Sequence, residues 1–112
     1  GSIFAVAVDL RPDSPTFGAI ASAELSDGNK KQLYVPFGFG FGFCATSNAA
    51  DVLYKLSAEH NEKGSGTINP FDPDLAIPWP TTRPLTSPGD KAAPFFKAWL
   101  AAAGPEPFRG VF

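Results

Sequence analysis

Leu33-Tyr-Val-Pro-Phe-Gly-Phe-Gly-Phe-Gly-Phe-Cys44 alternates phenylalanine with glycine over its second half. Because successive side chains of a β-strand point to opposite faces, the four phenylalanines share one face and the glycines lie on the other. These phenylalanines are Phe37, Phe39, Phe41 and Phe43. The pattern predicts a strand with an aromatic face, and the glycines leave room for another chain element on the opposite face.

The sequence on either side of this stretch predicts further strands. Residues 3–10 are apolar at almost every position, which is typical of a strand buried on two sides. Short runs separated by turns at this spacing favour a β-sandwich or barrel over βαβ units. The predicted strands are residues 3–10, 17–25, 31–35, 39–46 and 51–56.

The sequence changes in character after the last predicted strand. Residues 69–88 hold half of the chain's twelve prolines, which cannot donate to a β-ladder, so we expect an irregular segment strapped over the barrel. Residues 94–103 predict the one helix of the chain. Pro94 suits the first helical position, and Gly104 ends the helical pattern.

Size and composition exclude several classes of function. With 112 residues, residues 1–112 are expected to form a single domain. A net charge of -2 with scattered basic residues argues against a nucleic-acid or membrane partner. One cysteine and one histidine, His60, offer neither a disulfide nor a metal site. We therefore expect a cytoplasmic protein without metal or cofactor.

Seven stretches of the chain resemble the dTDP-4-dehydrorhamnose 3,5-epimerase family, in family order and over nearly the whole chain. The matching stretches are Ile3-Phe-Ala-Val-Ala-Val-Asp-Leu-Arg11, Ser14-Pro-Thr-Phe-Gly18, Gln32-Leu-Tyr-Val-Pro36, Gly38-Phe39 with Gly42-Phe43, Asp51-Val-Leu-Tyr-Lys55, Asp72-Pro-Asp-Leu-Ala-Ile-Pro-Trp-Pro80 and Asp90-Lys-Ala-Ala-Pro94. They resemble only the later part of the family sequence. The resemblance implies an all-β fold, a shortened cupin-type jelly-roll barrel of about seven strands with one short C-terminal helix.

The family's reaction indicates which residues matter. These isomerases of deoxysugar biosynthesis, the rhamnose route among them, remove protons beside the 4-keto group of a dTDP-linked 6-deoxyhexose and return them on the opposite face. The reaction needs a base, a His held by an Asp in this family, and an acid, a Tyr. The resemblance places Tyr54 at the position of the acid and Asp90 at that of the Asp. The family's Arg-Gly-Leu-His motif, which carries the base, has no counterpart in these residues.

Other positions depart from the family pattern. Phe41 stands where the family has a His, and Ala5 stands where it usually has an active-site Asp. Phe37 replaces a residue that is usually charged. Glu59 and His60 replace paired aromatic residues, one of which packs on the nucleotide base. The resemblance therefore implies a divergent epimerase relative with a dTDP-linked sugar as its ligand, catalytically incomplete as a chain of 112 residues.

The aromatic face has three possible roles. The favoured one is core filling, since large aromatic rings tend to be buried; replacing Phe41 by His would then destabilise the fold by a few kcal/mol. The second is an apolar ligand pocket. Its lining would be Phe39, Phe41, Phe43 and Ala5, with Tyr54 beside them. The third is a non-catalytic scaffold that homodimerises through an exposed sheet edge.

The two candidate catalytic residues also have structural interpretations. Tyr54 could be a barrel tyrosine whose hydroxyl bonds to a neighbouring strand. Asp90 precedes the predicted helix and could cap or electrostatically favour its N-terminus. His60 lies beside acidic residues in a polar stretch, where we expect a solvated side chain.

Overall fold

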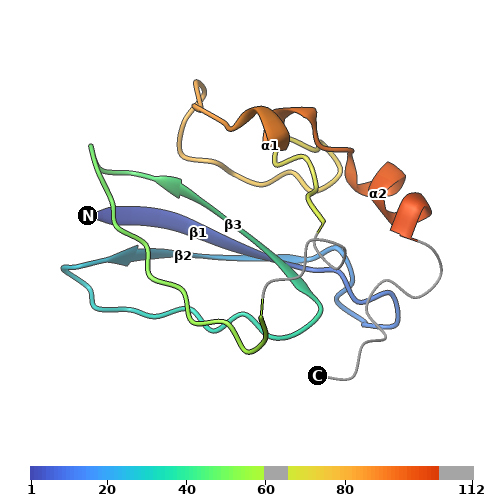
Figure 1. The fold of residues 1–112 in the computed structure, drawn as a ribbon, viewed down its shortest axis with the longest axis horizontal. Coiled ribbons are helices and arrows are strands. Elements are labelled where there is room, and N and C mark those ends of the chain that lie inside the picture. The colour runs from blue at the N-terminus through green and yellow to red at the C-terminus, as the bar shows by residue number, and fades with distance from the viewer. Residues whose placement is uncertain (60–65, 104–112) are drawn as a thin grey trace.

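The computed structural model describes residues 1–59 and 66–103, which build a three-stranded antiparallel sheet with two short helices (Figure 1). Strand β1 (Ser2–Asp9) lies in the centre, between β2 (Ile20–Ser26) and β3 (Phe39–Ala45). The two outer strands each pair with β1 along most of its length. The sheet is therefore organised around the first strand of the chain.

Strand β1 is buried on both of its faces, which confirms the prediction from its apolar sequence. Val6, Val8 and Leu10 point toward the C-terminal segment, where Val8 and Leu10 form a buried cluster with Leu75 and Phe96. Figure 1 shows this segment, with helices α1 (Pro88–Ala92) and α2 (Phe96–Ala103), lying over one face of the sheet. The Pro-rich residues thus form the strap that their composition predicts.

The glycines of β3 allow the strap to lie close to the sheet. A Cβ at Gly42 would lie 3.4 Å from the indole of Trp79 in the strap; at Gly40 the near neighbour is instead Leu10, which follows β1, at 3.0 Å. The indole N–H of Trp79 donates to the carbonyl of Pro70 (2.7 Å), which fixes the ring in that position. The prediction that the glycine face accommodates another chain element is confirmed.

Two buried polar side chains tie the strap to the helices. Asn69 donates through its side-chain amide to the carbonyls of Lys91 (3.3 Å) and Ala93 (3.2 Å). The carboxylate of Asp72 accepts the N–H of Phe96, the first residue of α2, at 2.5 Å. Since a buried helix end needs such partners, Asp72 acts as a remote cap of α2.

The predicted barrel does not form in the described residues. Residues 31–35 and 51–56, both predicted as strands, are extended but belong to no sheet, so three strands replace the expected seven and the sheet does not close. Edge pairing requires a neighbouring strand, and within the described ranges neither segment has one. The sheet strands begin and end within a few residues of their predicted bounds.

The helical prediction needs two corrections. Helix α2 begins at Phe96, two residues after the predicted start, where Asp72 caps it. Helix α1 was not predicted; it begins at Pro88 because Ser87 accepts the N–H of Asp90 as its N-cap. In the part of the chain that the structure describes, neither helix is long and apolar enough to cross a membrane.

Ala76 carries a testable strain, because its φ of 50° lies in the left-handed region. An L-residue in this conformation carries about 1–2 kcal/mol of backbone strain. Glycine has no such strain, but it loses about 0.5–1 kcal/mol more conformational entropy than alanine on folding. Ala76→Gly should therefore raise the free energy of unfolding by about 0.5 kcal/mol in urea denaturation. The matched change Ala98→Gly, inside α2, should lower it by about 1 kcal/mol. Equal losses from both changes would contradict this account of Ala76.

Candidate functional site

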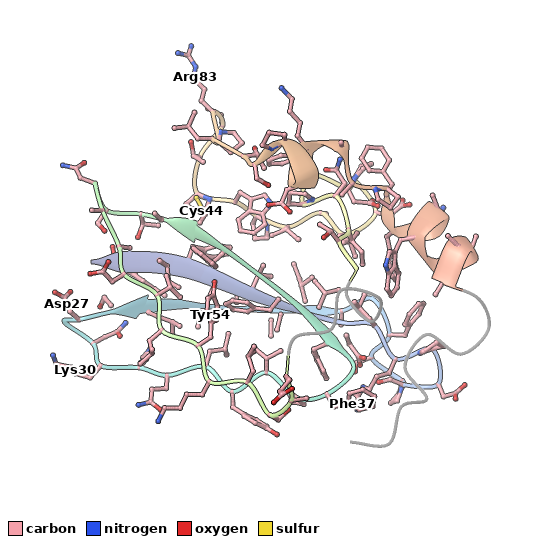
Figure 2. All side chains as sticks on the ribbon, viewed as in Figure 1. Asp27, Lys30, Phe37, Cys44, Tyr54 and Arg83 are labelled. Carbon is pink, nitrogen blue, oxygen red and sulfur yellow. The ribbon has the colours of Figure 1, made fainter. Side chains whose placement is uncertain are left out.

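A cavity of about 1390 Å³ wraps around the free edge of β3 and reaches both faces of the sheet. On one face the glycines of β3 lie against Trp79 of the strap. On the other face the phenylalanines of β3 meet Tyr54, whose label in Figure 2 marks its place beside the sheet. Tyr54 and Asp90 both line this hollow, Tyr54 on the phenylalanine face of β3 and Asp90 in the segment that lies over the glycine face.

Three aromatic rings form a cluster on the cavity wall. The Tyr54 ring meets Phe41 edge-on, with centroids 6.1 Å apart, and lies tilted against Phe43 at 6.4 Å. Phe41 and Phe43 are 41% and 40% exposed, and Tyr54 is 53% exposed. The core-filling interpretation is therefore wrong for Phe41 and Phe43. No described element covers this side of the rings, so they remain half-buried cavity lining.

The hydroxyl of Tyr54 makes no hydrogen bond in the described ranges, 1–59 and 66–103. The interpretation of Tyr54 as a tyrosine bonded to a neighbouring strand is therefore wrong. Its ring is held by an edge-on contact with Phe41 and a tilted contact with Phe43, which position the phenol and leave its hydroxyl available. The group can thus donate a proton or a hydrogen bond to a molecule in the cavity.

Asp90 precedes the predicted helix and lies in the first turn of α1, a helix that was not predicted, where its negative charge suits the helix N-terminus as the electrostatic interpretation expects. Its backbone N–H donates to the Ser87 hydroxyl (3.1 Å), so Ser87 is the cap and the capping role proposed for Asp90 is wrong. The carboxylate is partly exposed to the cavity and makes no hydrogen bond or ion pair with any described residue. Tyr54 and Asp90 therefore share a cavity without contacting each other.

The remaining predicted residues divide into two groups. Phe39 lines the cavity, and the Arg11 guanidinium lies over its ring, 4.8 Å from the ring centroid. Ala5, predicted as pocket lining, is fully buried and does not reach the cavity, because it sits in the central strand opposite Ala23 and Phe43. His60 lies outside the described residues.

Several polar residues of the cavity were missed by the sequence analysis. Ser47, Asn48, Arg83 and Ser87 all line it. Figure 2 shows the Arg83 side chain directed outward at the rim. No motif distinguished these residues, since Ser47 and Asn48 also suit an ordinary turn, and Arg83 and Ser87 each simply precede a proline. Among the described residues, no group of three His, Cys, Asp or Glu could hold a metal ion.

A second polar cluster lies at the end of β1, and its hydrogen bonds stabilise the turn that follows this strand. The buried carboxylate of Asp9 accepts hydrogen bonds from the Arg11 guanidinium (3.0 and 2.9 Å) and from the hydroxyls of Ser14 (2.6 Å) and Thr16 (2.5 Å). The Arg11 hydrogen bonds, with smaller contributions from the two hydroxyls, hold the pKa of Asp9 well below its usual range despite burial. A carboxylate held ionised in this way cannot serve as an acid near neutral pH.

The folded chain is similar to sugar-nucleotide epimerases of known structure. It superimposes on the Mycobacterium tuberculosis epimerase with a TM-score of 0.89 at 40% identity, covering 92% of this chain and 53% of that one. The dTDP-6-deoxy-D-glucose-3,5-epimerase of Legionella pneumophila, determined in complex with dTDP-4-keto-L-rhamnose, gives a TM-score of 0.71 at 36% identity over 91% of this chain and 55% of that one. The described residues therefore share the fold of the corresponding part of sugar-nucleotide epimerases.

The sequence comparisons give the family. Residues 1–98 match the family model of dTDP-4-dehydrorhamnose 3,5-epimerase, so the chain belongs to this family. The dTDP-4-dehydrorhamnose 3,5-epimerase of Neisseria gonorrhoeae is 45% identical over 103 residues, which cover 91% of this chain and 30% of that protein. The chain spans about a third of that relative and about half of the two related structures.

Replacing Phe41 by His tests the half-exposed position of this ring. Because the ring is 41% exposed, the substitution should lower the free energy of unfolding by only about 1 kcal/mol, measured by urea denaturation. The same change at the buried Phe96 should cost about 3 kcal/mol. Similar losses at both positions would mean that Phe41 is buried in solution.

Proposed function

We propose that the cavity lined by Tyr54 and Asp90 binds a dTDP-linked 4-keto-6-deoxyhexose. The observation that carries the proposal is the placement of both residues on one cavity, each with its functional group unbonded within the described part of the chain. The volume of about 1390 Å³ leaves room for a sugar nucleotide, since small-molecule sites usually take roughly 300–1,000 Å³. The Legionella relative carries a ligand of this class.

Within this proposal the two residues have different roles. Tyr54 is the proton donor, because its phenol is accessible and oriented by Phe41 and Phe43. Asp90 is the carboxylate that orients a base, since its free oxygens can accept an N–H. At the polar rim, the Ser87 hydroxyl offers a hydrogen bond to a diphosphate, and Arg83 offers positive charge once its outward-directed side chain turns toward the ligand.

We also propose that residues 1–112 alone do not catalyse epimerisation. Proton removal beside the ketone needs a base, and no His or Lys is found among the cavity-lining residues that the structure describes. Phe41 supplies an apolar ring where the family has an imidazole. We infer that these residues hold the sugar nucleotide without inverting its C3 or C5 carbon.

Solvent deuterium exchange tests this function. The chain is incubated in D₂O with dTDP-4-keto-6-deoxy-D-glucose, and loss of the C3 and C5 proton signals is followed by NMR. No exchange above a protein-free sample is expected, whereas the M. tuberculosis epimerase serves as positive control. Exchange that the Tyr54→Phe variant abolishes would show that the chain already contains a working base.

A further inference from the structure

The turn that follows β2 carries the only aspartate–glycine pair of the chain. Asp27 precedes Gly28, and the Asp27 side chain is 80% exposed. Figure 2 shows Asp27 at the end of the sheet opposite to α2, directed away from the strands. Among the described residues, its carboxylate contacts only the N-terminal ammonium of Gly1, at 3.5 Å. Because exposed ion pairs of this kind are weak, the carboxyl group can change its rotamer.

The backbone nitrogen that follows Asp27 is also unoccupied. The N–H of Gly28 donates to no residue within the described ranges. Its neighbours in the turn are bonded, since the Lys30 N–H donates to the Ser26 carbonyl (3.0 Å) and the Asn29 N–H to the Ser26 hydroxyl (3.0 Å). Gly28 has no side chain, and the atom nearest to an added Cβ would be 3.7 Å away. Neither a hydrogen bond nor a side chain therefore keeps this nitrogen from the carboxyl carbon of Asp27.

The other aspartates lack this combination. Asp13 is also exposed and precedes a small residue, but the N–H of Ser14 donates to the Arg11 carbonyl (3.1 Å). The N–H that follows Asp90 donates to the Ser87 carbonyl (3.0 Å). The rest precede leucine, valine or proline, whose side chains crowd the nitrogen or leave it without a proton. These are Asp9, Asp51, Asp72 and Asp74.

We propose that Asp27 is a site of spontaneous isomerisation to isoaspartate. The lone pair of the Gly28 nitrogen attacks the protonated side-chain carboxyl carbon of Asp27, so that a C–N bond forms. The carboxyl hydroxyl leaves with the proton of the nitrogen as one water molecule, which gives a five-membered succinimide. The succinimide takes up one water and opens at either C–N bond. One opening restores aspartate, and the other gives isoaspartate, whose backbone contains one extra methylene and whose α-carboxylate is free.

The extra methylene changes a turn that depends on its exact length. The Asn29 side chain accepts the N–H of Ser26 (3.0 Å) and donates to the Glu24 carbonyl (2.8 Å), so it bridges both sides of the insertion. Isomerisation at Asp27 lengthens the chain between Ser26 and Asn29 and breaks this bridge.

The new α-carboxylate defines the class of enzyme that would act on the site. It lies on an exposed turn, and it is the group that protein L-isoaspartate methyltransferases methylate with S-adenosylmethionine. No residue of this turn lines the cavity, so the modification does not depend on the proposed function.

Ageing of the purified chain tests the proposal. The chain is kept for several weeks at a mildly acidic pH, which increases the protonated fraction of a carboxyl group. Isoaspartate is measured by methyl transfer from labelled S-adenosylmethionine and located by peptide mapping. We expect about ten times more isoaspartate at Asp27 than at the exposed Asp13. Gly28→Ala should slow the reaction at Asp27 about tenfold, because its methyl group crowds the nitrogen.

Ageing in concentrated urea separates the effect of the fold from that of the sequence. Unfolding frees the Ser14 N–H, so the isoaspartate at Asp13 should rise severalfold relative to that at Asp27. Circular dichroism confirms that Gly28→Ala is folded before ageing. Absence of isoaspartate at Asp27, or equal amounts at Asp27 and Asp13 in the folded chain, would overturn the proposal. An unchanged rate in Gly28→Ala would do the same.

Discussion

Replacing Asp9 by Asn is expected to lower the free energy of unfolding by about 3 kcal/mol, as measured by urea denaturation. The side chain of Asp9 is 2% exposed and collects charge-assisted hydrogen bonds from Arg11, Ser14 and Thr16. An amide keeps one acceptor oxygen and brings a donor toward groups that already donate. The turn that follows β1 then loses the anion around which it folds.

The pH dependence of stability should change in the same variant. The pKa of Asp9 is held well below its value of about 3.9 in an unfolded chain, chiefly by hydrogen bonds from Arg11. Its contribution is therefore present above about pH 4 and is lost as the pH falls further. The unfolding free energy of the unaltered chain should drop more steeply between about pH 5 and 2 than that of Asp9→Asn.

Asp13 provides the control for the stability measurement. It is exposed in the same turn, so Asp13→Asn should change the unfolding free energy by less than about 0.5 kcal/mol. Parallel pH profiles for the unaltered chain and Asp9→Asn would show that Asp9 does not set the acid stability.

The second large effect is expected at Gly38, where Ala should cost about 2–3 kcal/mol of stability. Gly38 has a φ of 84°, and a Cβ there would lie 2.4 Å from Cγ and 2.9 Å from Cδ of Arg11. Its carbonyl accepts the N–H of Leu10 (3.0 Å), so the backbone cannot easily move away. The methyl group would displace Arg11 from both Asp9 and Phe39.

Two comparisons make this prediction specific. Gly28→Ala should change stability by less than about 0.5 kcal/mol, because the nearest atom to its added Cβ is the Ser26 hydroxyl at 3.7 Å. Gly38→Ala combined with Asp9→Asn should cost less than the sum of the two single changes, since both act through Arg11. Strict additivity would contradict this coupling.

The parts of the fold that depend on local pattern could be predicted from the sequence. The apolar run of β1 and the Gly-Phe alternation of β3 correctly indicate a buried strand and a two-sided one. Residues 31–35 and 51–56 carry similar strand propensity but form no sheet, because pairing depends on a neighbour that propensity does not reveal. The remote cap at Asp72 was also missed, since its partner Phe96 lies far along the chain.

The residues of the candidate site were proposed from the family resemblance, whereas their surroundings could not be predicted. The family resemblance identified Tyr54 and Asp90, and the structure places both on one cavity. The exposure of Phe41 could not be foreseen, because hydrophobicity alone does not tell whether another element covers a ring. For the same reason Ala5 appeared as pocket lining although the central strand buries it.

An NMR titration of the ¹⁵N-labelled chain with dTDP tests most directly whether the cavity is a sugar-nucleotide site. We expect saturable shifts of the backbone amides of Tyr54, Gly42 and Asp90, which line the cavity. The amides of Ser14 and Thr16, in the turn after β1, should not shift. The absence of saturable shifts at millimolar dTDP, or shifts confined to that turn, would contradict the account.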